Sequence, residues 1–269
     1  MSTTERAATL ERTAVFAERR ARAQELALRY DYAAEPLRLY AALLDAQATA
    51  YERALVARPA IADLPAFVVR ESLPGIMEVA MTAGTEALRE AVLTRFHDGD
   101  LEEIVRAWLA EAELDATDVF LARAATSPVL EALSALGADL GSRTEDERRC
   151  PACGGLPQLA IFTDTGEALL TGQRRLVCSR CATEWTYARM TCVSCRETGG
   201  ARLPILADEA RLPHLRIDAC EVCHAYLVTV DLRKDTSAVP LVDEIAALPL
   251  DLAAAERGFT KITRNVVGL

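Results

Sequence analysis

All eight cysteines of this 269-residue chain lie between Cys150 and Cys223, and every one belongs to a C-x-x-C pair. The pairs repeat the pattern C-x2-C-x24-C-x2-C twice, and Cys192 lies 42 positions after Cys150. The first copy contains Cys150, Cys153, Cys178 and Cys181, and the second contains Cys192, Cys195, Cys220 and Cys223. The stretch therefore consists of two copies of one module.

A C-x-x-C loop can place two thiolates about 3.5–4 Å apart, along the edge of a tetrahedron whose centre lies about 2.3 Å from each sulfur. Two such loops complete a coordination shell, and soft thiolates in this geometry select zinc or rubredoxin-type iron. We therefore predict iron or zinc, up to two ions, each in a four-cysteine site with all eight cysteines as ligands. The 42-residue register favours contiguous quartets, although loops of different modules could also pair.

The residues after each loop bear on how the chain turns there. Gly154 and Gly155 follow the first loop, where a tight turn with positive φ lets amide groups point at sulfur. Ala182, Arg196 and His224 follow the other three loops. These loops must turn with residues less suited to positive φ.

Other uses of the cysteines fit the pattern less well. A disulfide scaffold requires an oxidising compartment, to which nothing in the chain points, whereas thiol–disulfide exchange by a C-x-x-C pair stays open. The segment Cys220–His224 also has the C-x-x-C-H form of c-type haem attachment, but that use would orphan the matching pair of its repeat. Chance placement explains His224 better, and roles as a ligand replacing a cysteine or as a donor to one stay open.

Composition limits the class of protein. Hydrophobic residues make up 51% and charged residues 26%, which is typical of a globular chain. No apolar run approaches 18 residues, and the N-terminus has no basic segment followed by an apolar one, so neither a membrane span nor a signal peptide is predicted. We expect a cytoplasmic protein with reduced thiols. A net charge of −10 argues against non-specific nucleic-acid binding.

Apolar spacing predicts helices over most of the first 140 residues. The expected helices span residues 1–30, 36–56, 67–71, 75–96, 101–113, 118–125 and 128–136. The first should be capped by Thr3 or Thr4 and bury Leu10, Val15, Phe16, Ala23, Leu26 and Leu28, while Tyr40 and Tyr51 should lie in the core. Asp100 and Glu103 form a capping box, and Ser127 followed by Pro128 predicts a helix start.

The pattern changes after the polar linker 141–149, which is the best domain boundary in the chain. Strands are expected at 159–163, 175–178, 184–189, 201–207, 215–218 and 225–231, with a turn signal at Asp164–Gly166. The last strand should be more buried than its counterpart, where Trp185 and Tyr187 alternate with polar residues. Beyond residue 234 we expect a helix opened by Pro240, a break at Pro249 and a second helix up to Gly258, followed by an extended tail.

The sequence contains no recognisable active site. It has no Gly-rich phosphate loop, G-x-S-x-G elbow or H-E-x-x-H helix. Its three histidines, His97, His214 and His224, support no triad, and a closed four-thiolate site has no open position for a substrate. We therefore predict that the protein is not an enzyme.

The cysteine motifs resemble those of a known family. They read C-P-A-C-G from Cys150, L-V-C-S-R-C-A-T-E-W from Leu176, R-M-T-C-V-S-C from Arg189 and D-A-C-E-V-C-H-A-Y-L from Asp218. This series resembles the FdhE family of formate dehydrogenase accessory proteins. The similarity extends to Pro36–Tyr40 and Leu241–Leu248, whereas His224 and the last seven residues depart from the family pattern.

The resemblance implies an α+β protein with a helical domain at residues 1–145, a first rubredoxin-like or zinc-ribbon module at 146–190 and a second at 191–269 that ends in a helical segment. It also implies a cytoplasmic maturation factor that binds the catalytic subunit of a formate dehydrogenase. Two alternatives stay open: a nucleic-acid-binding zinc ribbon and a rubredoxin-like electron carrier. The first would use Arg174, Arg175, Arg180 and Arg189 as a basic patch, although the acidic total of the chain favours a solvated face for these arginines.

Overall fold

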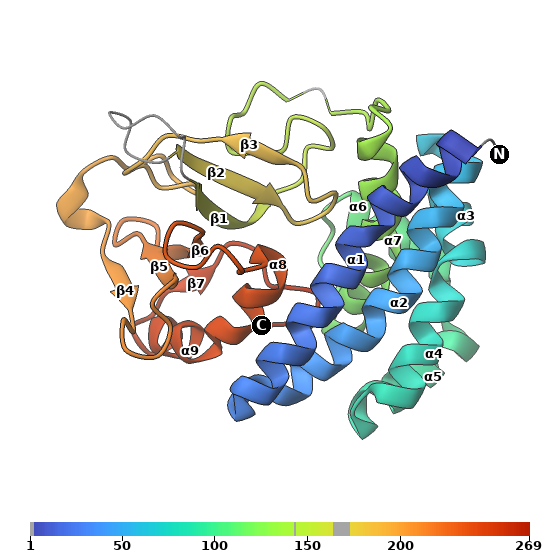
Figure 1. Cartoon of the computed structure of the whole chain (residues 1–269), viewed down its shortest axis with the longest axis horizontal. Coiled ribbons are helices and arrows are strands. Elements are labelled where there is room, and N and C mark those ends of the chain that lie inside the picture. The colour runs from blue at the N-terminus through green and yellow to red at the C-terminus, as the bar shows by residue number, and fades with distance from the viewer. Residues whose placement is uncertain (1–2, 143, 164–172) are drawn as a thin grey trace.

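The computed structural model describes residues 3–142, 144–163 and 173–269, with side chains from residue 14 onward. A helical N-terminal region stands beside a seven-stranded sheet, and short helices near the C-terminus pack against that sheet (Figure 1). The predicted α+β class and the order of its parts are confirmed. The side chains of Thr3, Thr4 and Leu10 and the turn signal at Asp164–Gly166 lie outside the described residues.

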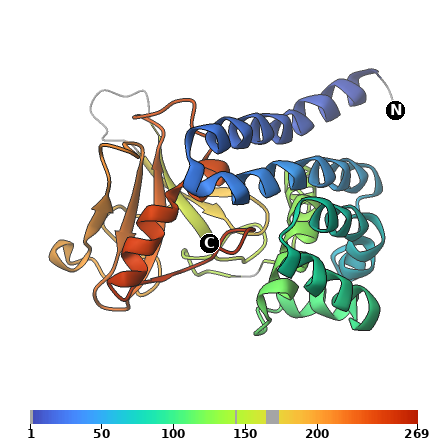
Figure 2. The same ribbon diagram turned by 90° about the horizontal axis from the view of Figure 1, so that it is seen from below.

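The helical region is built on two long antiparallel helices, α1 and α2, which lie side by side in both views (Figure 2). The helices are α1 (Thr3–Arg29), α2 (Ala34–Ala57), α3 (Leu64–Glu71), α4 (Leu73–Ala83), α5 (Glu86–Asp98), α6 (Leu101–Leu109) and α7 (Ala116–Ala135). Tyr40 and Tyr51 are buried as predicted, and the Tyr51 ring lies 5.2 Å from that of Phe16. Leu28 was placed wrongly in the core: it is exposed, because two residues after the buried Leu26 the helix has turned by about 200°.

The predicted helix 75–96 is two helices in the structure. Helix α4 ends at Ala83, and Thr85 then caps α5 by accepting a hydrogen bond from the amide of Leu88. A side chain cannot replace Gly84 without a clash, since a Cβ there would lie 2.3 Å from the carbonyl oxygen of Ala80. Half of the predicted capping box at Asp100 is confirmed, as the Asp100 carboxylate accepts from the amide of Glu103, whereas the Glu103 carboxylate accepts from Arg106.

Pro128 lies inside α7, so the predicted helix start at Ser127 is wrong. Proline has no N–H for the carbonyl four residues earlier, which leaves the oxygen of Ala124 without its helical donor. The side-chain amide of Gln47 fills this role with a hydrogen bond of 3.0 Å. The hydroxyl of Ser72 donates to the neighbouring carbonyl of Ala125 at 2.7 Å. Tertiary contacts therefore hold one continuous helix where the local sequence predicted two.

The two modules join in one sheet. Its strands are β1 (Pro157–Thr163), β2 (Gln173–Cys178), β3 (Glu184–Thr186), β4 (Ile205–Ala207), β5 (Leu215–Ala219), β6 (Ala225–Asp231) and β7 (Thr260–Lys261). The order is β3-β2-β1-β6-β5-β4, with β7 beside β6. Parallel pairing of β1 with β6 connects the modules. Within the modules, β7 also pairs with β6 in parallel, and the other strand pairs are antiparallel. The predicted strands are confirmed, although β3 and β4 are shorter than expected.

Strand β6 occupies the position in the second module that β3 occupies in the first, since both follow their last C-x-x-C loop. Strand β6 is central and buried, whereas β3 is a short edge strand with exposed Glu184 and Thr186. The prediction that the second of these strands is the more buried is therefore confirmed. Its burial follows from the β1–β6 pairing, which covers the β6 edge.

The two faces of the sheet have different surroundings. Side chains alternate between the faces along each strand. Leu159, Ile161 and Val228 belong to the large core shared with the helices, whereas Ala160 and Leu227 belong to a small separate cluster on the other face. The helices therefore cover only one face of the sheet.

The C-terminal segment links the modules to the helical region through buried charges. Helices α8 (Pro240–Asp243) and α9 (Leu248–Glu256) flank a short 3-10 turn, Glu244–Ala247, so the chain bends before Pro249 instead of at it. Arg22 of α1 donates two hydrogen bonds to Asp243, of 2.6 and 3.0 Å, and both side chains are buried. Among the described helices, none is both long and apolar enough to cross a bilayer.

Candidate metal centres

The four C-x-x-C loops share one backbone conformation. In each loop the amide of the first cysteine donates to the carbonyl five residues later, at 2.8–3.0 Å. These acceptors are the carbonyls of Gly155, Thr183, Glu197 and Ala225. The repeated hydrogen bond closes each loop into the same turn, so equal spacing in the sequence produces equal geometry.

Each loop is followed by a residue with positive φ, as the prediction required. The values are +73° at Gly154, +55° at Ala182, +67° at Arg196 and +56° at His224. Only the first loop uses glycine for this turn, and the other three hold an L-residue in a conformation that costs roughly 1 kcal/mol. Gly155 lies in a crowded place, because a Cβ there would lie 2.8 Å from Cδ of Arg180 and 3.1 Å from the sulfur of Cys178.

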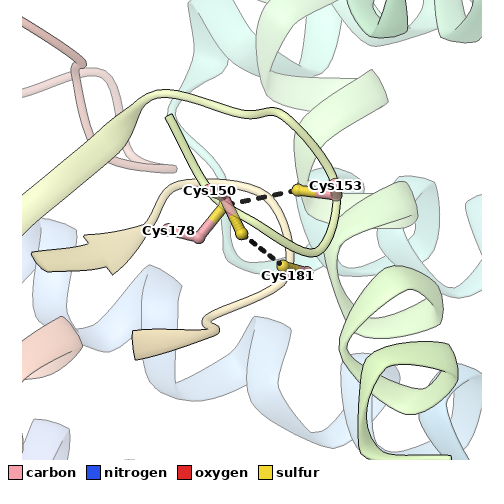
Figure 3. A group of neighbouring side chains, drawn as sticks. All are labelled: Cys150, Cys153, Cys178 and Cys181. Carbon is pink, nitrogen blue, oxygen red and sulfur yellow. Dashed lines mark hydrogen bonds between the residues drawn. The ribbon is translucent and has the colours of Figure 1, made fainter. Parts of the chain in front are cut away.

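The sulfur atoms gather as two contiguous quartets. In the first cluster, the Sγ atoms of Cys150 and Cys181 lie 3.6 Å apart, and those of Cys153 and Cys178 lie 3.4 Å apart (Figure 3). In the second, the corresponding distances are 3.6 Å for Cys192–Cys223 and 3.7 Å for Cys195–Cys220. Within each quartet all four sulfurs lie within 4.8 Å of one another. Crossed pairing between modules is thus excluded.

This donor set fits a tetrahedral thiolate site. With metal–sulfur bonds of about 2.3 Å, the edge of the tetrahedron measures about 3.8 Å. The closest sulfur–sulfur distances in both clusters come within a few tenths of an ångström of that edge. Two metal ions, one in each four-cysteine cluster, can therefore be accommodated.

The two clusters differ in how deeply their cysteines are buried. Cys150, Cys178 and Cys181 are buried in the main core, and Cys153 packs against it. The second cluster has no member among the described residues of that core, and its Cys195 is exposed. The first cluster is therefore part of the junction between helices and sheet, and the second lies at the periphery.

The pKa values of the cysteines differ within each cluster. Hydrogen bonds from Cys153, Cys178 and Cys181 lower the pKa of Cys150 far below its ordinary value. Burial opposes ionisation of Cys223, but hydrogen bonds from the amide of Ala225 and from neighbouring side chains outweigh it and lower its pKa to about 7. The same hydrogen bonds raise the pKa of Cys153, and burial raises the pKa of Cys192. Each quartet thus favours partial ionisation, and a metal ion would have to displace the remaining protons.

Arg180, inside the second loop of the first module, connects the first cluster to the helical region. Its guanidinium lies 5.2 Å from the centre of the Trp108 ring and donates to the Trp108 carbonyl at 3.1 Å. Glu111 accepts from both Arg180 and Arg149, which precedes Cys150. These contacts fix the first cluster against the end of α6.

A second contact comes from α7. The hydroxyls of Ser134 and Thr183 lie 2.8 Å apart, and the Thr183 hydroxyl lies 3.1 Å from the sulfur of Cys181. A chain of hydrogen bonds therefore runs from a helix of the N-terminal region to a sulfur of the first cluster. Sequence reasoning missed Trp108, Glu111 and Ser134, since none stands near a motif.

The linker contacts the second cluster through Arg148, Asp146 and Arg196. Arg148 donates to the carbonyl of Ser194, inside the third loop, at 2.6 Å, and Arg196 pairs with Asp146 at 3.0 Å. Two hydrogen bonds join Asp146 to Arg148 side by side, so one small charged group holds this loop. The polar linker that marked a boundary in the sequence is in fact the support of a candidate site.

The four arginines considered for nucleic-acid binding do not form one patch, since Arg174 and Arg189 line one pocket and Arg180 lines another. Arg174 and Arg175 are neighbours in β2, so their side chains lie on opposite faces of the sheet. Arg174 is buried and pairs with Asp218, while Arg175 pairs with Glu184. Arg180 is committed to the first cluster. Arg174 and Arg180 also do not belong to a solvent-exposed face, which was the alternative interpretation of these arginines.

The histidines do not join either quartet. The ring of His224 lies 6.0 Å from that of Phe259, and the group of four sulfurs beside it is complete without a nitrogen. His214 lies with Asp235 and Asp243 in a third group of suitable spacing, but Arg22 donates to both aspartates. A guanidinium already supplies the positive charge that a metal ion would bring there.

The chain was compared with known proteins. Residues 149–189 match the family model described as FdhE, central domain, and residues 190–267 match FdhE, C-terminal domain. Curated relatives include "Protein FdhE homolog" of Aquifex aeolicus, 40% identical over 44% of this chain, and that of Stutzerimonas stutzeri, 36% identical over 48%. Each of these matches covers 41% of the relative's own length.

A match to a solved structure reaches further. The crystal structure of the FdhE protein from Pseudomonas aeruginosa superimposes with a TM-score of 0.68 at 27% identity. It covers 95% of this chain and 96% of that one. The similarity in structure thus includes the helical region, where the family models do not match.

Proposed function

The chain belongs to the FdhE family, and from this premise we propose that it is a cytoplasmic maturation factor that binds the catalytic subunit of a formate dehydrogenase. The proposal takes its partner from the family resemblance. In this role the protein is not an enzyme, and its own residues bind metal and partner instead of transforming a substrate.

We further propose that each quartet holds one iron or zinc ion, with all eight cysteines as ligands. The observation that carries this proposal is the pair of closed four-sulfur clusters. When bound, such an ion would cross-link two loops of its module. Four thiolates fill a tetrahedral shell and leave no position for a substrate, which supports a structural or redox-sensing role over catalysis.

Modules of this size depend on such cross-links. The first module spans about 45 residues, close to the length at which a hydrophobic core alone stops being sufficient. Structural thiolate sites contribute on the order of 10 kcal/mol of binding free energy to folding. Metal loading would thus fix the shape of the surface that meets the partner.

The test is a pull-down of a formate dehydrogenase catalytic subunit by the tagged full-length protein, under reducing and anaerobic conditions. We expect the subunit to be retained by the metal-loaded protein and lost when both clusters are disrupted by Cys178→Ser with Cys220→Ser. Phe96→Leu, at an exposed position of α5, serves as a control for non-specific loss. Absence of binding to the metal-loaded protein would contradict the proposal.

One alternative has support from a particular observation. A rubredoxin-like electron carrier needs a redox-active metal near the surface, and the exposed Cys195 would bring such a metal there. Iron in a ferric tetrathiolate absorbs visible light and can be reduced, whereas zinc is colourless and redox-silent. A colourless zinc-loaded protein that still binds its partner would decide against the electron carrier.

A further inference from the structure

A pocket lies on the sheet face that the helices leave uncovered. Its volume is about 230 Å³, and strands of both modules contribute to its walls. Phe162 of β1, Arg174 of β2 and Arg216 of β5 line it together with Asp218. Sites for drug-sized ligands measure roughly 300–1,000 Å³, so this pocket suits a smaller molecule or one or two side chains of a peptide.

The charged side of the pocket holds more cations than anions. Arg174 and Arg216 share the single carboxylate of Asp218, at 3.4 and 2.9 Å. Arg189 also lines the pocket, so three guanidinium groups and one carboxylate belong to its lining, an excess of positive charge. A buried charge without a full counter-charge is costly, so this excess favours an anion in the pocket.

Arg174 supplies an enclosed donor that the protein leaves unused. Its terminal amino groups donate to the carbonyls of Ala188 and Thr191 and to Asp218. Its Nε is buried and has no hydrogen-bond partner among the residues that the structure describes. The Arg174 side chain is only 5% exposed, so this donor is held in place and does not belong to a flexible surface group.

Arg216 offers further donors beside it. Its hydrogen bond to Asp218 uses Nε, one of the three nitrogens of the guanidinium. The guanidinium carbon lies 4.8 Å from the centre of the Phe162 ring, and this contact restricts where the group can move. A planar guanidinium held in this way matches the two oxygens of a carboxylate.

The opposite wall of the pocket is apolar. Met190, Leu203, Ile205 and Ile262 line it, and Met190 and Ile205 are 61% and 52% exposed. Large apolar side chains left in contact with water beside a basic pocket favour a ligand with an apolar body next to its negative charge.

We propose that this pocket between the two modules binds a carboxylate attached to an apolar body, with Arg174 and Arg216 holding the carboxylate and Met190 and Ile205 covering the apolar part. The carboxylate can belong to a small free acid or to the C-terminal residue of a peptide. This inference does not depend on the proposed function, since it follows from the pocket alone.

Calorimetric titration of the metal-loaded protein tests it with matched pairs of probes. Hexanoate is compared with hexanamide, and N-acetyl-Leu-Leu with its C-terminal amide. We expect at least one acid to bind tenfold or more tightly than its own amide, because the amide keeps the shape but loses the charge. If the ratio of acid to amide affinity is larger for the peptide, the carboxylate belongs to a chain terminus. If the ratio is equally large for hexanoate, the carboxylate belongs to a free acid.

Variants separate the charged and apolar contributions. Arg216→Gln should abolish the preference for acid over amide, whereas Arg175→Gln, on the opposite face of the sheet, should preserve it. Ile205→Gln, at an exposed position, should weaken acid and amide equally and leave their ratio unchanged. Circular dichroism and metal content verify that each variant folds. If Arg216→Gln does not fold, the ratio of acid to amide affinity of the wild type is the deciding result.

Three results would overturn the proposal. The first is equal affinity of the wild type for acids and amides, or no binding of either. The second is loss of the preference in Arg175→Gln to the same extent as in Arg216→Gln. The third is displacement of the acids by inorganic phosphate at lower concentration than the acids themselves require, which would identify a phosphate site.

Discussion

The two four-cysteine clusters have the same spacing, the same backbone turns and nearly the same sulfur geometry, yet their surroundings differ. The first is buried between the sheet and helices α6 and α7, with Arg180 and Thr183 connecting it to Trp108 and Ser134. The second lies at the periphery, supported by the linker through Arg148. Local sequence thus determines the cluster, and tertiary packing determines what depends on it.

The largest expected contrast comes from removing one ligand at equivalent buried positions. Cys178→Ser should destabilise the whole protein, because the helical junction and the first module lose their shared support. Cys220→Ser, 42 residues later, should unfold mainly the second module. Each change removes part of a site worth on the order of 10 kcal/mol. Thermal unfolding followed by circular dichroism at the helical signal provides the comparison.

The comparison fails if Cys220→Ser lowers the midpoint of helical unfolding as much as Cys178→Ser does. That outcome would mean that the second cluster supports the helices equally, through the shared sheet. A surface change such as Phe96→Leu should change the free energy of unfolding by no more than about 0.5 kcal/mol.

Removal of metal by a chelator should proceed in two phases. The second cluster should release its ion first, because the exposed Cys195 admits a competing ligand while the first cluster is enclosed. We expect the two rates to differ by tenfold or more. Stopped-flow measurement with a chromogenic chelator checks this, and Cys220→Ser should lack the fast phase. A single phase in the wild type would show that burial does not distinguish the sites.

A smaller effect should follow from weakening the connection between Trp108 and Arg180. Trp108→Leu removes a cation–π contact with a guanidinium that is only 11% exposed. Such contacts contribute about 0.5–2 kcal/mol, depending on their exposure. We expect a loss of stability of that size, measured by urea denaturation. We also expect the slow phase of metal release, from the first cluster, to accelerate while the fast phase stays unchanged. An equal acceleration of both phases would refute a specific link to the first cluster.

The cysteine spacing was sufficient to predict the four loops and to favour contiguous quartets, and the structure decides for the contiguous pairing. The loops could be predicted because each depends on contacts within a few residues. The amide of Cys150 reaches the carbonyl of Gly155 without help from the remainder of the chain. Strand positions followed from alternation, and the buried faces of Tyr40 and Tyr51 followed from helical spacing. These features are local, so the sequence pattern contains them.

Other features depend on residues far apart in the sequence. Pro128 stays inside a helix because Gln47, 81 positions earlier, donates to the carbonyl that proline leaves free. The parallel pairing of β1 with β6 has no local signature, and it alone decides that the modules form one sheet. The roles of Arg174 and Arg180 likewise depend on distant partners, Asp218 and Trp108, so composition suggested a patch that the fold does not form.

The metal content of the two matched serine variants tests the central claim most directly. The wild type should bind two ions per chain, and Cys178→Ser and Cys220→Ser should each bind one, counted by elemental analysis on folded, reduced protein. This result would establish two independent sites, each built by one module. Loss of both ions from Cys220→Ser, whose change lies far from the helical junction, would contradict it.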